Sequence, residues 1–121
     1  MARFQELECW QEAAALAVEV YALTSSGTFR HDYGLCDQLR RSAISVASNI
    51  AEGKERETVS ELVRYLYIAK GSAGELWTQL HIAGRVGFLE GERARDLETR
   101  VTKVRAMLGA FIKVLKNTKQ A

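Results

Sequence analysis

The sequence predicts an all-α protein in which 121 residues form one antiparallel up-down-up-down four-helix bundle. Two observations carry this prediction. Apolar side chains recur at alternating steps of three and four residues, and turn signals divide them into four segments. No segment shows the strict alternation of apolar and polar residues that is typical of strands. The length suits a single domain over residues 1–121, and an apolar fraction of 47% suits a globular one.

The first helix is expected over about residues 6–26 and the second over about 32–52. Gly27 follows the first apolar stripe, and Asp32 can cap the second helix by accepting hydrogen bonds from its free N–H groups. Gly53 suits a left-handed C-terminal cap. The two apolar stripes are Cys9, Ala13, Leu16, Val20 and Leu23, then Leu35, Leu39, Ala43, Val46 and Ile50.

The third helix is expected over about residues 58–86 and the fourth over about 92–117. Thr58 and Glu61 have the spacing of a capping box at the start of the third helix. The connections between all four helices are short, which makes consecutive helices antiparallel neighbours. The stripes are Val59, Leu62, Leu66, Ala69, Ala73, Leu76, Leu80 and Ala83, then Leu97, Val101, Val104, Leu108, Phe111 and Leu115.

A polar stripe runs beside the apolar stripe on the second and third helices. Its candidate site residues are Gln38, Ser45, Asn49 and Glu52 on the second helix and Ser72, Glu75 and Gln79 on the third. Three interpretations stay open: a seam where small residues let two helices approach, a ligand pocket, and a contact with another subunit. Glu52 lies near a helix C-terminus, where a carboxylate needs a compensating cation such as Lys54 or Arg56.

A second line along the third helix carries large side chains away from the main apolar stripe. It contains Val63, Tyr67, Gly74, Trp77, His81 and Phe88, and further aromatic residues are Trp10, Tyr21, Phe29 and Tyr33. Extensive exposed apolar surface usually marks an interface, so we expect Trp77 and His81 to lie at a contact between copies of the chain. The alternative is that these residues flank the core.

Several classes of function find no support in the sequence. The two cysteines, Cys9 and Cys36, are expected to be free buried thiols. Neither His31 nor His81 has ligands at metal-binding spacing, and there is no phosphate-binding glycine loop or nucleophile elbow. We therefore expect a protein that is not an enzyme and has no cofactor or metal. No apolar run is long enough to span a membrane, and we expect a cytoplasmic protein.

The net charge is only +2, but its distribution is uneven. Residues 1–32 carry a net charge of −3 (2 basic, 5 acidic), residues 33–90 carry none (7 and 7), and residues 91–121 carry +5 (8 and 3). Basic groups can contact nucleic-acid phosphates, although a charged stripe is often only a solvated face. The candidates for binding RNA or DNA are Arg40, Arg41, Lys54, Arg56, Arg64, Arg100 and Lys103.

Three stretches resemble a known family: FQELECWQEAAALA, YGLCDQLRRSAISVASNIAEG and ELVRYLYIAKGSAGELWTQLHIAGRVGFL. The chain resembles the 23S rRNA-intervening-sequence proteins from about Phe4 to Leu115, and the two central motifs are specific. Residues that match the shared motif are Gln38, Arg40, Arg41, Ser45, Asn49, Glu52, Gly53, Gly71, Ser72, Glu75 and Gln79. Ala47 stands where the family often has proline, so the second helix is expected to be straighter.

The resemblance implies a four-helix bundle that assembles into a ring-shaped homopentamer. The family has no assigned catalytic residue and no established biochemical role. It is also similar to the accessory variability determinant of diversity-generating retroelements, a pentamer that works with a reverse transcriptase and binds nucleic acid. The sequence therefore predicts a non-enzymatic oligomer that binds RNA or DNA backbone as an accessory factor. A protein-interaction scaffold without nucleic-acid binding is the alternative, and a small-ligand binder or enzyme using Glu52, Glu75 and Gln79 is a third.

Overall fold

The structure, a computed structural model, describes residues 3–120 apart from the side chains of residues 28, 30, 119 and 120. Two short 3-10 helices precede the first two long helices, and no strand occurs in the described part of the chain. The predicted all-α class is confirmed. The elements are η1 (Phe4–Glu6), α1 (Glu8–Thr24), η2 (Gly27–His31), α2 (Tyr33–Lys54), α3 (Val59–Arg85) and α4 (Gly91–Gln120).

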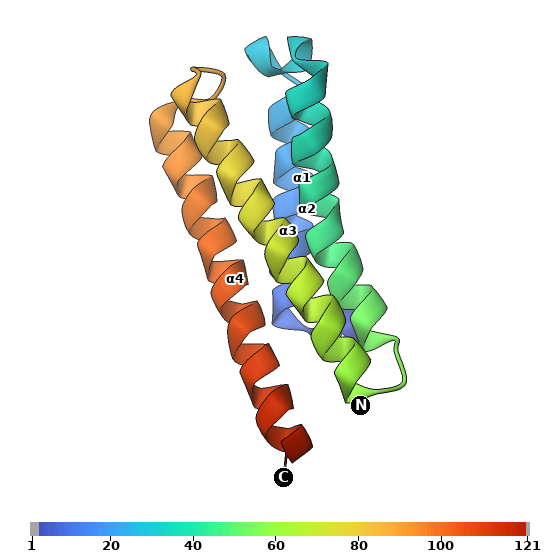
Figure 1. Ribbon diagram of the computed structural model, residues 1–121. Coiled ribbons are helices and arrows are strands. Elements are labelled where there is room, and N and C mark those ends of the chain that lie inside the picture. Colours follow the sequence, from blue (N-terminus) through green and yellow to red (C-terminus); the bar gives the residue numbers. More distant parts are fainter. Residues whose placement is uncertain (1–2, 121) are drawn as a thin grey trace.

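The four long helices lie side by side as a bundle (Figure 1). Each helix contacts the one that follows it in the chain, and α4 closes the bundle against α1. Consecutive helices run in opposite directions, so the α2–α3 connection and the C-terminus of α4 lie at the same end of the bundle (Figure 1). The long connection between α1 and α2 contains η2 and lies at the other end.

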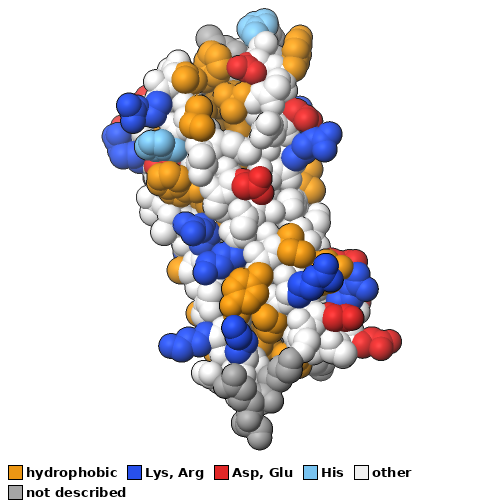
Figure 2. Space-filling view, viewed as in Figure 1, with side chains coloured by type: hydrophobic (Ala, Val, Ile, Leu, Met, Phe, Trp, Pro, Cys, Tyr) orange, Lys and Arg blue, Asp and Glu red, His pale blue; other side chains and the backbone are white. Residues whose placement is uncertain are grey.

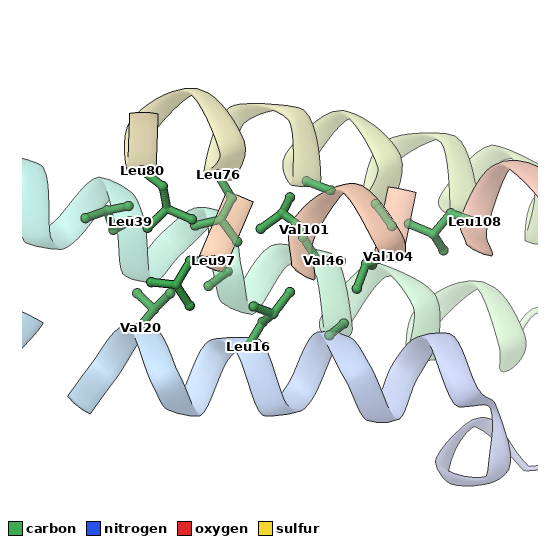
Figure 3. Close-up of a cluster of buried hydrophobic side chains, with 14 of the residues drawn as sticks. Leu16, Val20, Leu39, Val46, Leu76, Leu80, Leu97, Val101, Val104 and Leu108 are labelled. Carbon is green, nitrogen blue, oxygen red and sulfur yellow. The ribbon is translucent and has the colours of Figure 1, made fainter. Parts of the chain in front are cut away.

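The core lies between all four helices, and each apolar stripe contributes to it. Leu16 and Val20 from α1 meet leucines and valines of α2, α3 and α4 along the bundle axis (Figure 3). Leu39, Ile50, Leu66, Leu80, Leu97 and Leu108 are all fully buried. Because a helix buries one stripe of its surface, four stripes facing one another exclude water from a continuous apolar interior.

One position departs from the predicted core, and the structure decides a second one that the sequence left open. Val59 is the first residue of α3 and is 40% exposed. The sequence left open whether Phe29 lies at an interface or flanks the core, and in the structure it is only 2% exposed. It lies in η2, which packs across the end of α1 and α2, and its ring is 6.0 Å from that of Phe88. Phe29 therefore belongs to the core and cannot serve an interface.

The predicted N-cap at Asp32 is present, and so is the Thr58 half of the predicted capping box. Asp32 Oδ1 accepts a hydrogen bond from the Leu35 N–H at 3.0 Å, and Thr58 Oγ1 accepts one from the Glu61 N–H at 3.1 Å. Each bond satisfies a backbone donor that has no partner within its helix. The free cysteines are also confirmed: Cys9 and Cys36 are buried. Burial raises the pKa of both thiols, which favours their neutral form.

The prediction for Gly53 was wrong. Positive φ angles occur at Gly27 and Gly87, whereas Gly53 lies inside α2, which continues to Lys54. A Cβ atom on Gly53 would lie 2.8 Å from the Cβ of Tyr65 in α3. A glycine is therefore needed here because two helices approach closely at this point, and not because the backbone turns.

Removal of the Asp32 cap gives a test of this local structure. Asp32→Ala is expected to lower the free energy of unfolding by about 1 kcal/mol, because the Leu35 N–H loses its acceptor. Asp32→Asn keeps an oxygen at the same place and should change it much less. Urea unfolding followed by circular dichroism measures both values. Equal stability of the alanine variant and the parent protein would show that the cap contributes nothing.

Candidate functional site

The polar stripes of α2 and α3 meet in a hydrogen-bonded seam. Ser45 Oγ and Ser72 Oγ are 2.8 Å apart and share a hydrogen bond. Asn49 Nδ2 donates to the Ser45 carbonyl oxygen at 2.8 Å and to Ser45 Oγ at 2.9 Å. Ser72 is only 6% exposed, so its hydroxyl sits close to the core. These three residues tie the two helices together, as the seam interpretation requires.

Above this seam the two helices leave a groove of about 410 Å³. Gln79 Nε2 donates to Gln38 Oε1 at 3.2 Å and thereby links the helices at one end of it. Arg41 and Asp37 form an ion pair at 2.8 Å on its α2 side. The seam is thus not a dry, fully paired contact. The structure brings Gln38, Ser45, Ser72, Glu75 and Gln79 together around this groove.

Glu52 lies away from the groove, at the C-terminal end of α2. Its carboxylate pairs with Arg56 at 3.0 Å, which supplies the predicted compensating cation. Arg56 also donates to the Tyr65 hydroxyl at 2.6 Å, and this contact raises the pKa of its guanidinium further. Glu52, Arg56 and Tyr65 therefore form a surface cluster at the α2–α3 connection.

Trp77 and His81 lie on a different side of α3, which faces α4. Their rings stack with centroids 5.1 Å apart and an angle of 9° between the planes. His81 Nδ1 is 3.6 Å from Glu98 Oε1 of α4, and Trp77 packs against the core. The residues predicted for one interface thus divide between the α2–α3 seam and the α3–α4 seam. Val63, Phe88 and Trp10 also pack against the core, as the flanking-core alternative expects.

Exposed apolar side chains occur elsewhere on the surface. Tyr33 is 79% exposed, and Ile44, Ile68 and Ile82 are each between 40% and 48% exposed. Ile44 lies on α2, whereas Ile68 and Ile82 lie seven residues on either side of Glu75 on α3. The α2–α3 side of the bundle therefore combines a polar groove with exposed isoleucines.

The predicted basic residues do not form one cluster. Arg40 Nε donates to Thr24 Oγ1 at 2.8 Å, and its guanidinium lies 4.7 Å from the centre of the Tyr21 ring. Arg40 thereby holds the end of α1 to α2. Arg41 pairs with Asp37, and Arg64 lies over the Tyr65 ring at 5.7 Å. Lys54 and Arg56 lie at the α2–α3 connection, far along α2 from Arg40 and Arg41.

Two further candidates on α4 face acidic groups of α1. Arg100 Nη1 is 3.8 Å from Glu19 Oε1, and Lys103 Nζ is 3.8 Å from Glu12 Oε1. Arg93 adds a closer pair with Glu19 at 2.6 Å. The acidic N-terminal segment and the basic C-terminal segment therefore neutralise each other where α1 and α4 meet.

A basic surface that the site prediction did not include lies where α3 and α4 meet near the end of α4. From residue 99 to residue 121 the chain has six basic residues and no acidic one. Lys116 Nζ donates to the Tyr67 hydroxyl at 3.3 Å, and Tyr67 is 47% exposed. The Lys70 Nζ lies beside Gly109 of α4. We call Tyr67, Lys70, Arg105, Lys113 and Lys116 the basic face.

Figure 2 shows Lys and Arg side chains around an apolar patch over this part of α3 and α4. None of the four cations of the basic face has an acidic partner within 4.0 Å among the described residues. The signal was present in the sequence as the run without acidic residues. That this run lies beside Tyr67 and Lys70 follows from the packing of α4 against α3, which the sequence run alone does not reveal.

Among the described residues, no three His, Cys, Asp or Glu side chains are grouped so as to hold a metal ion. None of the described helices is both long and apolar enough to cross a membrane.

Comparison with known proteins agrees with the resemblance seen in the motifs. A crystal structure of a protein of unknown function from the S23 ribosomal protein family of Bacteroides thetaiotaomicron is similar in fold, with a TM-score of 0.80. The two sequences are 20% identical, and the match covers 87% of this chain and 98% of the other. No curated protein matches the sequence. The family model of the 23S rRNA-intervening sequence protein matches residues 5–110, and the chain therefore belongs to this family.

Proposed function

We infer that this protein is a non-enzymatic, up-down-up-down four-helix bundle that assembles with copies of itself and binds the backbone of RNA or DNA. The observation that carries the proposal is the basic face, where Lys116 contacts the exposed Tyr67 and none of the four cations has an acidic partner among the described residues. Ring-shaped homopentamers, and a role as an accessory to another protein, are what the resemblance implies for such a bundle.

The electrostatics of the basic face favour phosphate as its ligand. Cations that already pair with carboxylates, such as Arg100 and Lys103, contribute less to an external field than unpaired ones. Lys70, Lys113 and Lys116 keep their charge available for phosphate oxygens and would release counterions on binding. Such contacts position a nucleic acid without reading its sequence.

Tyr67 adds a preference for unpaired strands. Its ring is exposed and lies 5.5 Å from Lys116 Nζ, so a base stacked on the ring would have its phosphate beside a cation. Combinations of a basic groove and an aromatic ring are typical of single-stranded nucleic-acid binding. In an oligomer each basic face is repeated, and weak contacts at several copies add through multivalency.

The test is a titration of labelled single-stranded RNA at several salt concentrations. We expect the affinity to fall as salt rises, and the variant Lys70→Gln/Lys113→Gln/Lys116→Gln to bind roughly tenfold more weakly at about 0.1 M salt. Its salt slope should fall by about 2, because each lost phosphate contact on a single strand contributes about 0.7. Fluorescence anisotropy measures both quantities.

A matched control removes the same charge elsewhere. Arg93→Gln/Arg100→Gln/Lys103→Gln also loses three positive charges, but from residues that face Glu12 and Glu19. We expect its affinity to fall less than that of the lysine variant. Equal losses would indicate a general charge effect, and absence of binding by the parent protein at low salt would contradict the proposal.

A protein-interaction scaffold is the second candidate, and the exposed isoleucines beside the α2–α3 groove favour it. A partner protein that stays bound after nuclease treatment, together with no affinity for RNA, would support the scaffold over nucleic-acid binding.

The double variant Arg40→Ala/Arg41→Ala tests the sequence prediction that these two arginines bind nucleic acid. If these two arginines contact phosphate, their loss weakens binding to all sequences alike, and an unchanged affinity excludes them.

A further inference from the structure

The groove between α2 and α3 contains polar groups that the fold itself leaves without partners. Ser42 is only 7% exposed, lines the groove, and makes no hydrogen bond or ion pair through its side chain with the described residues. Glu75 lines the same groove and has no cation or hydrogen-bond donor among those residues. The hydroxyl of a largely buried serine and the carboxylate of the exposed Glu75 thus face one space.

Gln79, which also lines the groove, carries a third unsatisfied acceptor. Gln79 donates through Nε2 to Gln38, but its Oε1 atom is buried and accepts no hydrogen bond from the described residues. An unpaired buried carbonyl oxygen is costly, and such groups in native proteins call for an explanation. Gln38 is exposed and holds the Nε2 end of this amide, so a ligand that displaces Gln38 would leave the Gln79 amide free to turn its oxygen towards the groove.

We propose that this groove binds a small organic cation through an ammonium or guanidinium group. Both groups carry several N–H donors and no acceptor, which matches the carboxylate of Glu75, the hydroxyl of Ser42 and the oxygen of Gln79. Charge-assisted hydrogen bonds to a carboxylate are the strongest of these contacts. The single basic residue of the groove, Arg41, is already paired with Asp37.

The charge and size of the groove narrow the class of ligand. Asp37 and Glu75 against Arg41 give the lining a net charge of −1, which disfavours phosphate or carboxylate ligands. Its volume of about 410 Å³ falls at the lower end of the usual range for small-molecule sites. Polar side chains dominate the lining, so a purely apolar ligand would leave Ser42 and Glu75 unsatisfied. A short alkyl amine or guanidine meets all three conditions.

Calorimetric titration at low ionic strength tests the proposal with defined probes. Agmatine and butylammonium should bind the full-length protein, whereas butyrate and butanol, of similar size, should not. Glu75→Gln keeps the shape of the side chain and should weaken agmatine binding roughly tenfold or more, because the hydrogen bonds to a charged acceptor are lost. Ser42→Ala should weaken it several-fold, by about the value of one neutral hydrogen bond.

Glu61→Gln is the control, since it removes an exposed carboxylate from the same helix away from the groove. It should leave agmatine affinity unchanged. Failure of both cations to bind the parent protein, or equal affinities for the parent and Glu75→Gln, would overturn the proposal. The proposal would also be overturned if no cation bound and Glu75→Gln formed smaller assemblies than the parent protein. The groove would then be assigned to a contact between copies of the chain.

This inference is independent of nucleic-acid binding, because the groove lies between α2 and α3 whereas the basic face lies between α3 and α4. The groove variants should therefore leave RNA affinity unchanged. Cation binding without RNA binding by the parent protein would contradict the proposed function and leave this inference standing, and RNA binding without cation binding would do the opposite.

Discussion

Truncation of Leu97 to alanine is expected to lower the free energy of unfolding by about 2–5 kcal/mol. Leu97 is 0% exposed and lies where α4 meets the other three helices (Figure 3). Its loss removes buried apolar surface and leaves a cavity that close-packed neighbours fill only in part. Urea unfolding of both proteins at equal chain concentration gives the difference, since assembly makes stability depend on concentration.

Val114→Ala is the control for this prediction. Val114 lies on the same helix but is 61% exposed, so its truncation should change stability by no more than about 0.5 kcal/mol. A small effect at Leu97 would mean that the four apolar stripes do not form one tightly packed core.

The second large effect concerns Gly53. An alanine there places a methyl group 2.8 Å from the Cβ of Tyr65 and 3.1 Å from Cδ1 of Leu62, so α2 and α3 must move apart. Overpacking of this kind costs about 1–3 kcal/mol, against a gain of about 0.5–1 kcal/mol from the better helix propensity of alanine. We therefore expect Gly53→Ala to destabilise the protein, as measured by thermal or urea unfolding.

Gly71→Ala should change stability in the opposite direction. Gly71 lies within α3, and nothing is within 4 Å of the position where its Cβ would lie. Only the higher helix propensity of alanine then acts, and we expect the free energy of unfolding to rise by about 0.5–1 kcal/mol. If both glycine variants stabilise the protein, α2 and α3 do not approach as closely at Gly53 as described.

Much of the fold was predictable because each helix is marked by residues that lie close together in the sequence. Apolar steps of three and four residues identified the four stripes, and Asp32 and Thr58 marked helix starts through bonds within a few residues. Gly53 shows the limit of such reasoning. A glycine near a helix end has a local explanation, the left-handed cap, and here its cause is a contact with Tyr65, which only the packed structure contains.

The candidate site was predictable only in part, for the same reason. The polar stripes of α2 and α3 met as expected, since Ser45 bonds to Ser72 across the seam. The basic face depended on how α4 is rotated against α3, and no pattern within α4 alone places Lys116 beside Tyr67. The sequence left the burial of Phe29 open, because that burial depends on how the η2 segment covers the end of the bundle.

The most direct test of the proposed assembly and nucleic-acid binding is the molar mass of the purified protein by light scattering, with its absorbance ratio recorded on the same sample. The account predicts a mass near five times the 13.5 kDa chain and, before nuclease treatment, an absorbance ratio that reveals bound nucleic acid. A particle of 13.5 kDa with the absorbance ratio of protein alone would contradict it.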